Sequence, residues 1–146
     1  MKINAISDFF KNLINETEEK SEIKVYKKFI AILSDLNNKD LTEKQLKLIE
    51  DELETLNLNP PDRKKYFKLK FTQFTKFLKH KLSMISEGYY TSIGIGLGLS
   101  FGVAFGAAFE NVSFGLIFGM LIGLVIGVSL DSKAKKEGKV LKTKLN

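Results

Sequence analysis

The sequence predicts an all-α membrane protein, in which an N-terminal cytosolic helical bundle precedes a two-helix transmembrane hairpin packed through rows of glycine. Two observations predict this fold class. The first is a long apolar stretch, because no charged residue lies between Glu87 and Glu110 or between Glu110 and Asp131. The second is the placement of glycine, since nine of the eleven glycines lie within residues 94–127.

The apolar stretch predicts two membrane spans, at about residues 89–109 and 112–130. At about 1.5 Å per residue, either helix is long enough to cross a hydrocarbon core of about 30 Å. The linking pair Glu110-Asn111 is too short for any connection except a helical hairpin. Burial of residues 92–130 in a soluble core would require an apolar partner of similar size, and the rest of the chain has none.

Glycine recurs every fourth residue within each predicted span. The opening IGIGLGLS alternates with a period of two, which would also fit a strand. The longer series places glycine along one helical face, and an open strand pair leaves its edges without hydrogen bonds in lipid. We therefore predict helices whose packing residues are Gly94, Gly98, Gly102, Gly106, Gly115, Gly119, Gly123 and Gly127.

These rows indicate close helix packing, because small residues allow two backbones to approach each other inside a bilayer. The rows would meet each other within one hairpin or meet those of neighbouring copies. Bulky residues run beside them, at Phe101, Phe105 and Phe109 and at Phe114 and Phe118. These phenylalanines would pack between hairpins in a homo-oligomeric ring or face lipid in a simple anchor.

Residues 1–87 predict about four polar helices with apolar residues at spacings of three and four. Asn37-Asn38-Lys39 reads as a turn, and Asp40 with Glu43 as a capping box. Pro60-Pro61 separates the third helix from a fourth at about 62–87. That last helix carries an aromatic stripe surrounded by lysines, which would pack against the other helices or a neighbouring subunit, or lie on anionic headgroups.

The charges predict the topology. Residues 1–59 carry net −3, residues 60–87 net +6, and a basic tail at 131–146 net +4. Basic flanks place both termini on the cytoplasmic side of an inner or plasma membrane, and Glu110 with Asn111 outside at a possible pore mouth. The expected membrane-surface residues, which would contact anionic lipid, are Lys76, Lys79, Lys81, Tyr89, Tyr90, Lys133, Lys135 and Lys136. Because the basic excess flanks the spans, no nucleic-acid partner is expected.

The sequence predicts no enzyme, and no catalytic, cofactor-binding or metal-binding residues. The chain contains no cysteine, and its single histidine, His80, lies among lysines. The glycine-rich run GIGLGLSFG lacks the lysine and polar surroundings of a phosphate-binding loop. We therefore do not expect the function to be a catalysed reaction.

The two glycine series, 94–106 and 115–127, resemble those of glycine-zipper membrane proteins. That class includes the pore-lining helices of large-conductance mechanosensitive channels and the membrane segment of a vacuolating toxin. The resemblance covers about a quarter of the chain and concerns a packing motif. It implies homo-oligomeric helix packing, frequently around a pore, and assigns no functional residue.

Three functions fit these features. The first is a self-assembling pore or membrane-disrupting effector, of the kind found among bacterial toxins and phage-defence proteins. The alternative is a non-conducting adaptor or scaffold whose helical domain binds a cytosolic protein. It is favoured by the absence of ionisable residues within the spans. The third is membrane shaping by the fourth helix and a wedge-like hairpin.

Overall fold

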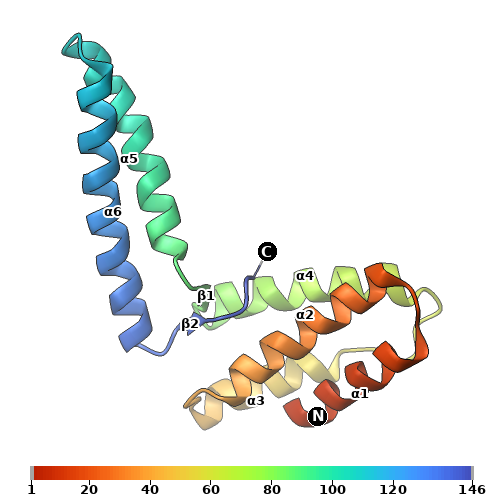
Figure 1. The fold of residues 1–146 in the computed structure, drawn as a ribbon. Helices are drawn as coiled ribbons and strands as arrows, with labels where there is room; N and C mark the ends of the chain where they lie inside the picture. Colours follow the sequence, from red (N-terminus) through yellow and green to blue (C-terminus); the bar gives the residue numbers. More distant parts are fainter. Residues whose placement is uncertain (1, 146) are drawn as a thin grey trace. The chain divides into compact units, whose positions relative to one another are not determined.

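The computed structural model describes residues 2–145, which form six helices and one two-stranded sheet. The chain divides into two compact units. Residues up to Met84, together with the segment from Leu141 onward, form the N-terminal unit, and Ile85–Val140 form the hairpin unit. Figure 1 labels the helices and strands of both units.

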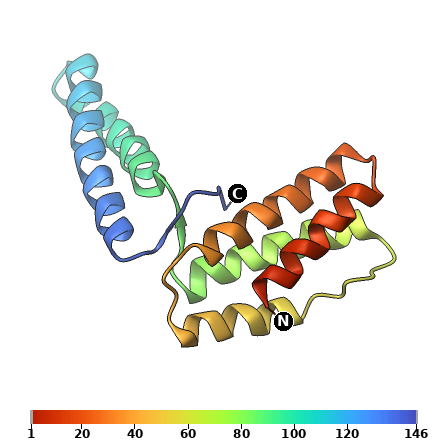
Figure 2. The ribbon, with the colours of Figure 1, turned by 60° about the horizontal axis from the view of Figure 1, so that its bottom comes forward.

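The N-terminal unit contains the helices α1 (Ile3–Glu16), α2 (Lys20–Asn37), α3 (Glu43–Glu54) and α4 (Arg63–Lys81). Helix α2 packs against both α1 and α4, and the second view shows the same neighbours (Figure 2). The predicted break at residues 16–22 falls between α1 and α2, where the chain is extended at Thr17 and Glu19. All of the helices expected before the spans are therefore present in this unit.

An aromatic cluster forms the centre of the N-terminal unit. The rings of Phe10 and Phe29 stack with centroids 4.4 Å apart, and Phe67 meets Phe10 edge-on at 5.2 Å. Phe71 meets Phe29 edge-on, also at 5.2 Å. Phe67, Phe71, Phe74 and Leu78 of α4 are all buried. The aromatic stripe of α4 therefore packs inside its own unit and does not lie on a membrane surface.

Helix α3 begins with a capping box that differs from the predicted one. The side chain of Thr42 accepts from the backbone N–H of Gln45, and the Gln45 side chain accepts from the backbone N–H of Thr42. The predicted pair Asp40 and Glu43 fails because Asp40 lies two residues before the N-cap. The spacing of three was right, but the box begins two residues later in the chain.

Helix α4 ends six residues before the predicted end at Glu87. Its last residue is Lys81, and Ser83 adopts a left-handed backbone conformation with φ of 53°. The N–H of Met84 then donates to the carbonyl of Leu78 at 3.0 Å, which closes the helix end. Strand β1 (Ile85–Ser86) follows in place of further helix. Leu82 and Met84 are buried although neither is helical, which explains the continued apolar pattern.

The C-terminal segment differs from the expected basic tail. Gly138, with φ of 67°, turns the chain into strand β2 (Val140–Leu141), which pairs with β1. Leu141 and Leu145 are buried in the core cluster of the N-terminal unit. The N–H of Thr143 donates to the carboxylate of Asp35 at 2.6 Å. Because the segment is rich in lysine, its sequence did not indicate that Leu141 and Leu145 are core residues.

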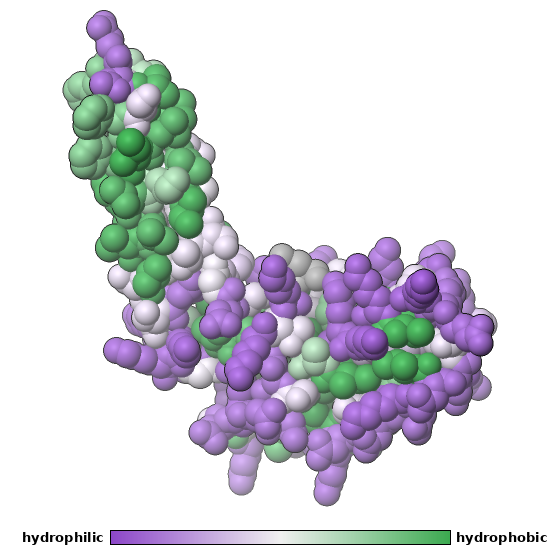
Figure 3. Space-filling model, viewed as in Figure 1, coloured by the Kyte–Doolittle hydropathy of each residue, from purple (hydrophilic) through white to green (hydrophobic). Residues whose placement is uncertain are grey.

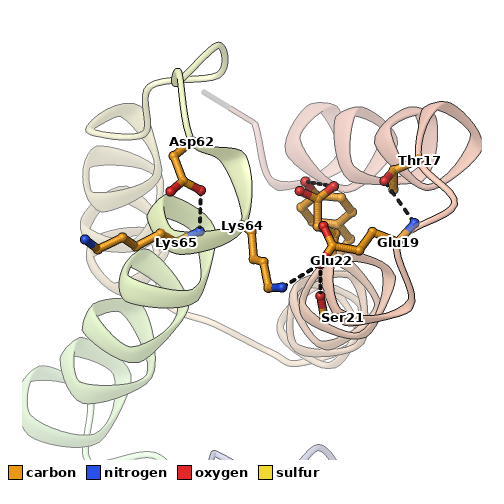
Figure 4. A network of polar contacts seen from close by, with 8 residues as sticks. Thr17, Glu19, Ser21, Glu22, Asp62, Lys64 and Lys65 are labelled. Atoms are coloured by element: carbon orange, nitrogen blue, oxygen red, sulfur yellow. Dashed lines mark hydrogen bonds and ion pairs between the residues drawn. The ribbon is translucent and has the colours of Figure 1, made fainter.

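Ion pairs join α4 to the start of α2, where Figure 4 shows Lys64 reaching Glu19, and to the end of α1. Arg63 pairs with Glu16 at 3.1 Å, and Lys64 with Glu19. The hydrogen bond from Lys64 holds the pKa of Glu19 below its usual value, and Glu19 raises the pKa of Lys64 in return. Both pairs are exposed to solvent, so each contributes little to stability.

Candidate functional site

Two long apolar helices form the hairpin unit, α5 (Tyr89–Ala108) and α6 (Val112–Lys136). Each is long and apolar enough to cross a membrane. The face of the hairpin that Figure 3 shows is largely hydrophobic, and its exposed apolar side chains include Phe109, 79% exposed, and Val125, 65% exposed. An apolar patch of this extent suits lipid and not water. The helix bounds lie close to the predicted spans, except that α6 continues to Lys136.

The two glycine rows face each other between α5 and α6. A Cβ atom added at any of the eight glycines would lie closer than 3.0 Å to backbone atoms of the facing helix or of the turn between the helices. Three pairs are reciprocal, since each member would collide with the carbonyl oxygen of the other: Gly94 with Gly123, Gly98 with Gly119, and Gly102 with Gly115. Only glycine permits this approach of the two backbones.

One further glycine of the hairpin, Gly96 of α5, lies outside this contact. A Cβ atom added at Gly96 would meet nothing within 4 Å. Gly94 and Gly98 on either side belong to the packed row, whereas Gly96 does not. The alternation of glycine at positions 94, 96 and 98 is therefore not itself a packing feature. The eight glycines at spacing four lie in the contact and Gly96 does not, so Gly96 provides a matched control for them.

The turn between the helices is closed by its own residues. Glu110 has a left-handed backbone, with φ of 57°, and its N–H donates to the carbonyl of Ala107 at 3.2 Å. The side chain of Asn111 caps α6 by accepting from the N–H of Phe114 at 3.2 Å. Glu110 and Asn111, the predicted pore-mouth residues, therefore build the turn, and the Asn111 side chain is engaged in capping.

Asp131 of α6 caps the N-terminus of α5 at the other end of the hairpin. Its carboxylate accepts from the backbone N–H groups of Tyr90 and Thr91, at 3.0 and 2.8 Å, and from the Thr91 hydroxyl at 2.6 Å. The first N–H groups of a helix lack partners within the helix and attract negative charge. The N-cap residue of α5, Gly88, has no side chain to meet this need.

Sequence reasoning missed Asp131, although the glycine register contained the signal. Gly94 faces Gly123 and Gly127, and one helical turn further from the hairpin turn brings residue 90 to residue 131. The first charge after the second span is thus the residue opposite the unsatisfied N–H groups of the first. Extending the register of an antiparallel zipper would have identified the pair.

Replacing Asp131 with alanine should destabilise the hairpin by about 1–3 kcal/mol, because a helix cap and charge-assisted hydrogen bonds are lost. The local effect should be faster hydrogen exchange at the amides of Tyr90 and Thr91. Asp131→Asn, which keeps one acceptor oxygen, should give an intermediate rate. Ser132→Ala, at the exposed neighbouring position, is the control. Unchanged exchange at residues 90 and 91 in Asp131→Ala would refute the cap.

Three serine hydroxyls of the hairpin donate hydrogen bonds within their own helices. Ser92 donates to the carbonyl of Gly88 at 2.9 Å, Ser100 to Gly96 at 2.9 Å, and Ser129 to Val125 at 2.8 Å. Such bonds to the preceding turn remove the donor from any other role. The hydroxyl donors of these three serines are therefore engaged within their own helices.

One face of the hairpin is hollowed into a groove of about 530 Å³, here called the aromatic groove. Its floor is formed by the glycine rows and its rims by large apolar residues of both helices. The rim residues are Leu97, Phe101, Phe105, Phe118, Ile122 and Ile126. The groove is apolar throughout, so it fits an acyl chain or an apolar ridge of another helix.

The predicted membrane-surface residues fall in both units. Tyr89 and Tyr90 are the first residues of α5, with ring centroids 5.3 Å apart, and Lys133, Lys135 and Lys136 occupy the last turn of α6. Cations in a last turn also complement the helix dipole. Lys76, Lys79 and Lys81 belong to α4 in the N-terminal unit. Among residues 2–145, no group of histidines and carboxylates could hold a metal ion.

Two apolar helices joined by a tight turn and packed glycine against glycine define a membrane hairpin of the glycine-zipper type. Residues 86–133 match the family model described as "Glycine zipper membrane protein". The match covers about a third of the chain, includes both glycine rows and Asp131, and confirms the resemblance read from the sequence. No curated protein and no solved structure matches the chain. The hairpin unit thus makes this a membrane protein, and the N-terminal unit lies outside the match.

Proposed function

We propose that the protein is a membrane-anchored binding module, in which the hairpin is a self-contained two-span anchor and the N-terminal unit binds a cytosolic ligand or protein. The observation that carries this proposal is the closure of the glycine rows on each other within one chain. Rows that are already packed need no neighbouring copy to satisfy them. The abundance of glycine is thereby explained without an oligomer.

The polar groups of the hairpin support the same proposal. Glu110 and Asp131 bound the second span, and the carboxylate of Asp131 is engaged by the start of α5. The hydroxyls of Ser92, Ser100 and Ser129 are bonded to their own helices. An ion path usually needs ionisable or unsatisfied polar groups along its length. The basic residues flanking both spans favour a cytosolic N-terminal unit.

A flux measurement tests the anchor. Purified full-length protein in liposomes should leave the ion and dye permeability equal to that of empty liposomes at every protein density. In cells, replacement of residues 85–140 by an unrelated two-span hairpin should preserve the phenotype that the wild-type protein produces. Flux that rises with protein density would overturn the proposal. Loss of that phenotype in a replacement that is still inserted and folded would also overturn it.

The aromatic groove supports a second candidate, a self-assembling oligomer that could enclose a pore. A groove with a glycine floor and phenylalanine rims fits a ridge of large side chains from a second hairpin. Ile122 lines this groove, whereas Ile117 is equally exposed outside it, at 60% and 58%. Ile122→Trp should therefore dissociate the oligomer in detergent and Ile117→Trp should not. A wild-type monomer would rule this candidate out.

A further inference from the structure

A second groove, in the N-terminal unit, gathers four lysines. It lies between α2 and α4, has a volume of about 370 Å³, and is here called the lysine groove. Its lining residues are Ser21, Lys24, Val25, Lys28, Lys64, Lys68, Phe71 and Thr72. All of them belong to one compact unit. Figure 4 shows Lys64 of α4 reaching across to Glu19 beside Ser21.

The lysines of this groove are arranged as two pairs of like charge. Lys24 and Lys28 are one turn apart on α2, and Lys64 and Lys68 are one turn apart on α4. Like charges at this spacing destabilise a helix, and two such pairs facing one groove repel each other further. Water and salt screen part of this repulsion, because Lys24, Lys64 and Lys68 are exposed, and an anion bound in the groove would relieve the rest.

The carboxylates that the chain brings near this groove, Glu19, Glu22 and Asp62, all act on Lys64. Lys64 pairs with Glu19, whose carboxylate also accepts from the Ser21 hydroxyl at 2.7 Å. Lys24 and Lys68 are exposed and form no ion pair or hydrogen bond through their ammonium groups within residues 2–145. The Lys64–Glu19 pair is half exposed on both sides, so an incoming anion can exchange with Glu19 at little cost.

The floor of the lysine groove is apolar. Phe71 is buried beneath it, and the ammonium of Lys28 lies 5.5 Å from the centroid of the Phe71 ring. Val25 is partly exposed beside it. A concave apolar floor with cationic rims suits a ligand that carries both negative charge and an apolar or planar part.

We propose that the lysine groove binds a phosphate-bearing ligand, with Lys24 and Lys68 as its principal phosphate contacts and Val25 and Phe71 beneath the rest of the molecule. This deepens the proposed function, on which it rests, by naming the class of ligand for the binding unit. Lysine ammonium groups bind phosphate as compact point charges, and two helices here present them together. The phosphate belongs either to a soluble compound or to a phospholipid headgroup.

Lysine footprinting on the full chain tests this site and separates the two sources. The protein is placed in nanodiscs of phosphatidylcholine alone, with or without sodium pyrophosphate, and in nanodiscs that also contain phosphatidylglycerol. Amine acetylation is then measured by mass spectrometry. Protection of Lys24 and Lys68 by pyrophosphate indicates a soluble ligand, and protection by phosphatidylglycerol indicates a headgroup. Lys44 and Lys47, exposed on α3, should react equally in every sample. Protection in neither arm would overturn the proposal.

A charge-matched pair of variants gives an independent test. Lys24→Gln with Lys68→Gln should weaken binding of the protecting probe by about tenfold or more, because charge-assisted hydrogen bonds are lost. Lys44→Gln with Lys47→Gln removes the same charge elsewhere and should leave binding within about twofold of wild type, because distant exposed charges are screened. Helical content should be unchanged in both. Equal weakening in the two variants would show general attraction in place of a site.

The outcomes for the anchor and for the groove are distinguishable. If Lys24 and Lys68 are not protected while liposomes remain impermeable, the lysine groove is wrong and the anchor stands. If the lysines are protected but the liposomes leak, the groove stands and the anchor is wrong.

Discussion

Replacing Gly102 with leucine is expected to abolish the packed hairpin. A Cβ atom at this position would collide with the carbonyl group of Gly115, which is main chain and cannot move without displacing α6. Overpacking a core costs about 1–3 kcal/mol where side chains can yield, and more is expected against backbone. Denaturation in mixed detergent micelles, followed by energy transfer between dyes on cysteines introduced at Ser92 and Ser129, measures the separation of the helices.

Gly96→Leu is the matched control for this substitution. It lies in the same helix, adds the same side chain, and meets nothing within 4 Å at its Cβ. Its denaturation curve should match wild type or show slight stabilisation, because glycine lowers helix propensity by about 1 kcal/mol. If Gly96→Leu and Gly102→Leu separated equally easily, the glycine rows would not be the packing surface.

Leu141→Ala is expected to destabilise the N-terminal unit by about 2–5 kcal/mol, the usual cost of truncating a buried leucine. Leu141 is fully buried in that unit, although more than fifty residues of hairpin separate it from the preceding core residue, Met84. Chemical denaturation monitored by circular dichroism, with the hairpin held in nanodiscs, measures this free energy. The helices of the N-terminal unit should unfold at lower denaturant concentration.

Two control variants bracket this result. Lys142→Ala changes the exposed neighbour in the same segment, and Leu69→Ala truncates a leucine that is 56% exposed on α4. Both should stay within about 0.5 kcal/mol of wild type, as surface substitutions usually do. A stability of Leu141→Ala equal to theirs would mean that residues 141–145 are a loose tail, as the lysine-rich sequence suggested.

Periodicity was sufficient to predict the hairpin. Glycine at spacing four marked the packed faces of α5 and α6, and the uncharged stretches marked their lengths. The same kind of pattern placed the four helices before them. These features are local and repeat along the chain, so they can be recognised in a single sequence. The aromatic stripe of α4 was visible too, but whether it met protein or lipid depended on partners that periodicity does not identify.

Features made by distant residues were not predictable in the same way. The burial of Leu141 and Leu145 depends on a chain reversal at Gly138. Because lysines lie between these leucines, the segment was interpreted as a basic cytoplasmic tail. The cap on α5 joins residues forty positions apart. The lysine groove combines two helices whose relative rotation no sequence pattern reports, so the sequence showed the lysines of the fourth helix only as neighbours of its aromatic stripe.

The structure also changes the meaning of the glycine rows. As a sequence pattern they fitted packing within a hairpin and packing between copies, and both the double row and the resemblance favoured homo-oligomers. Their closure within one chain leaves the aromatic groove as the surface available to a second hairpin. Assembly, if it occurs, would then use phenylalanine and isoleucine side chains against the groove.

The most direct test of the self-contained hairpin is a distance measurement by pulsed electron paramagnetic resonance on one doubly labelled chain. Because the protein contains no cysteine, Ser92→Cys and Ser129→Cys accept spin labels without competing sites. The labelled chain is reconstituted alone and then diluted into a large excess of unlabelled wild type. The account predicts one short, narrow distance distribution that does not change on dilution. A distribution that broadens or disappears on dilution would place the glycine contacts between chains and contradict it.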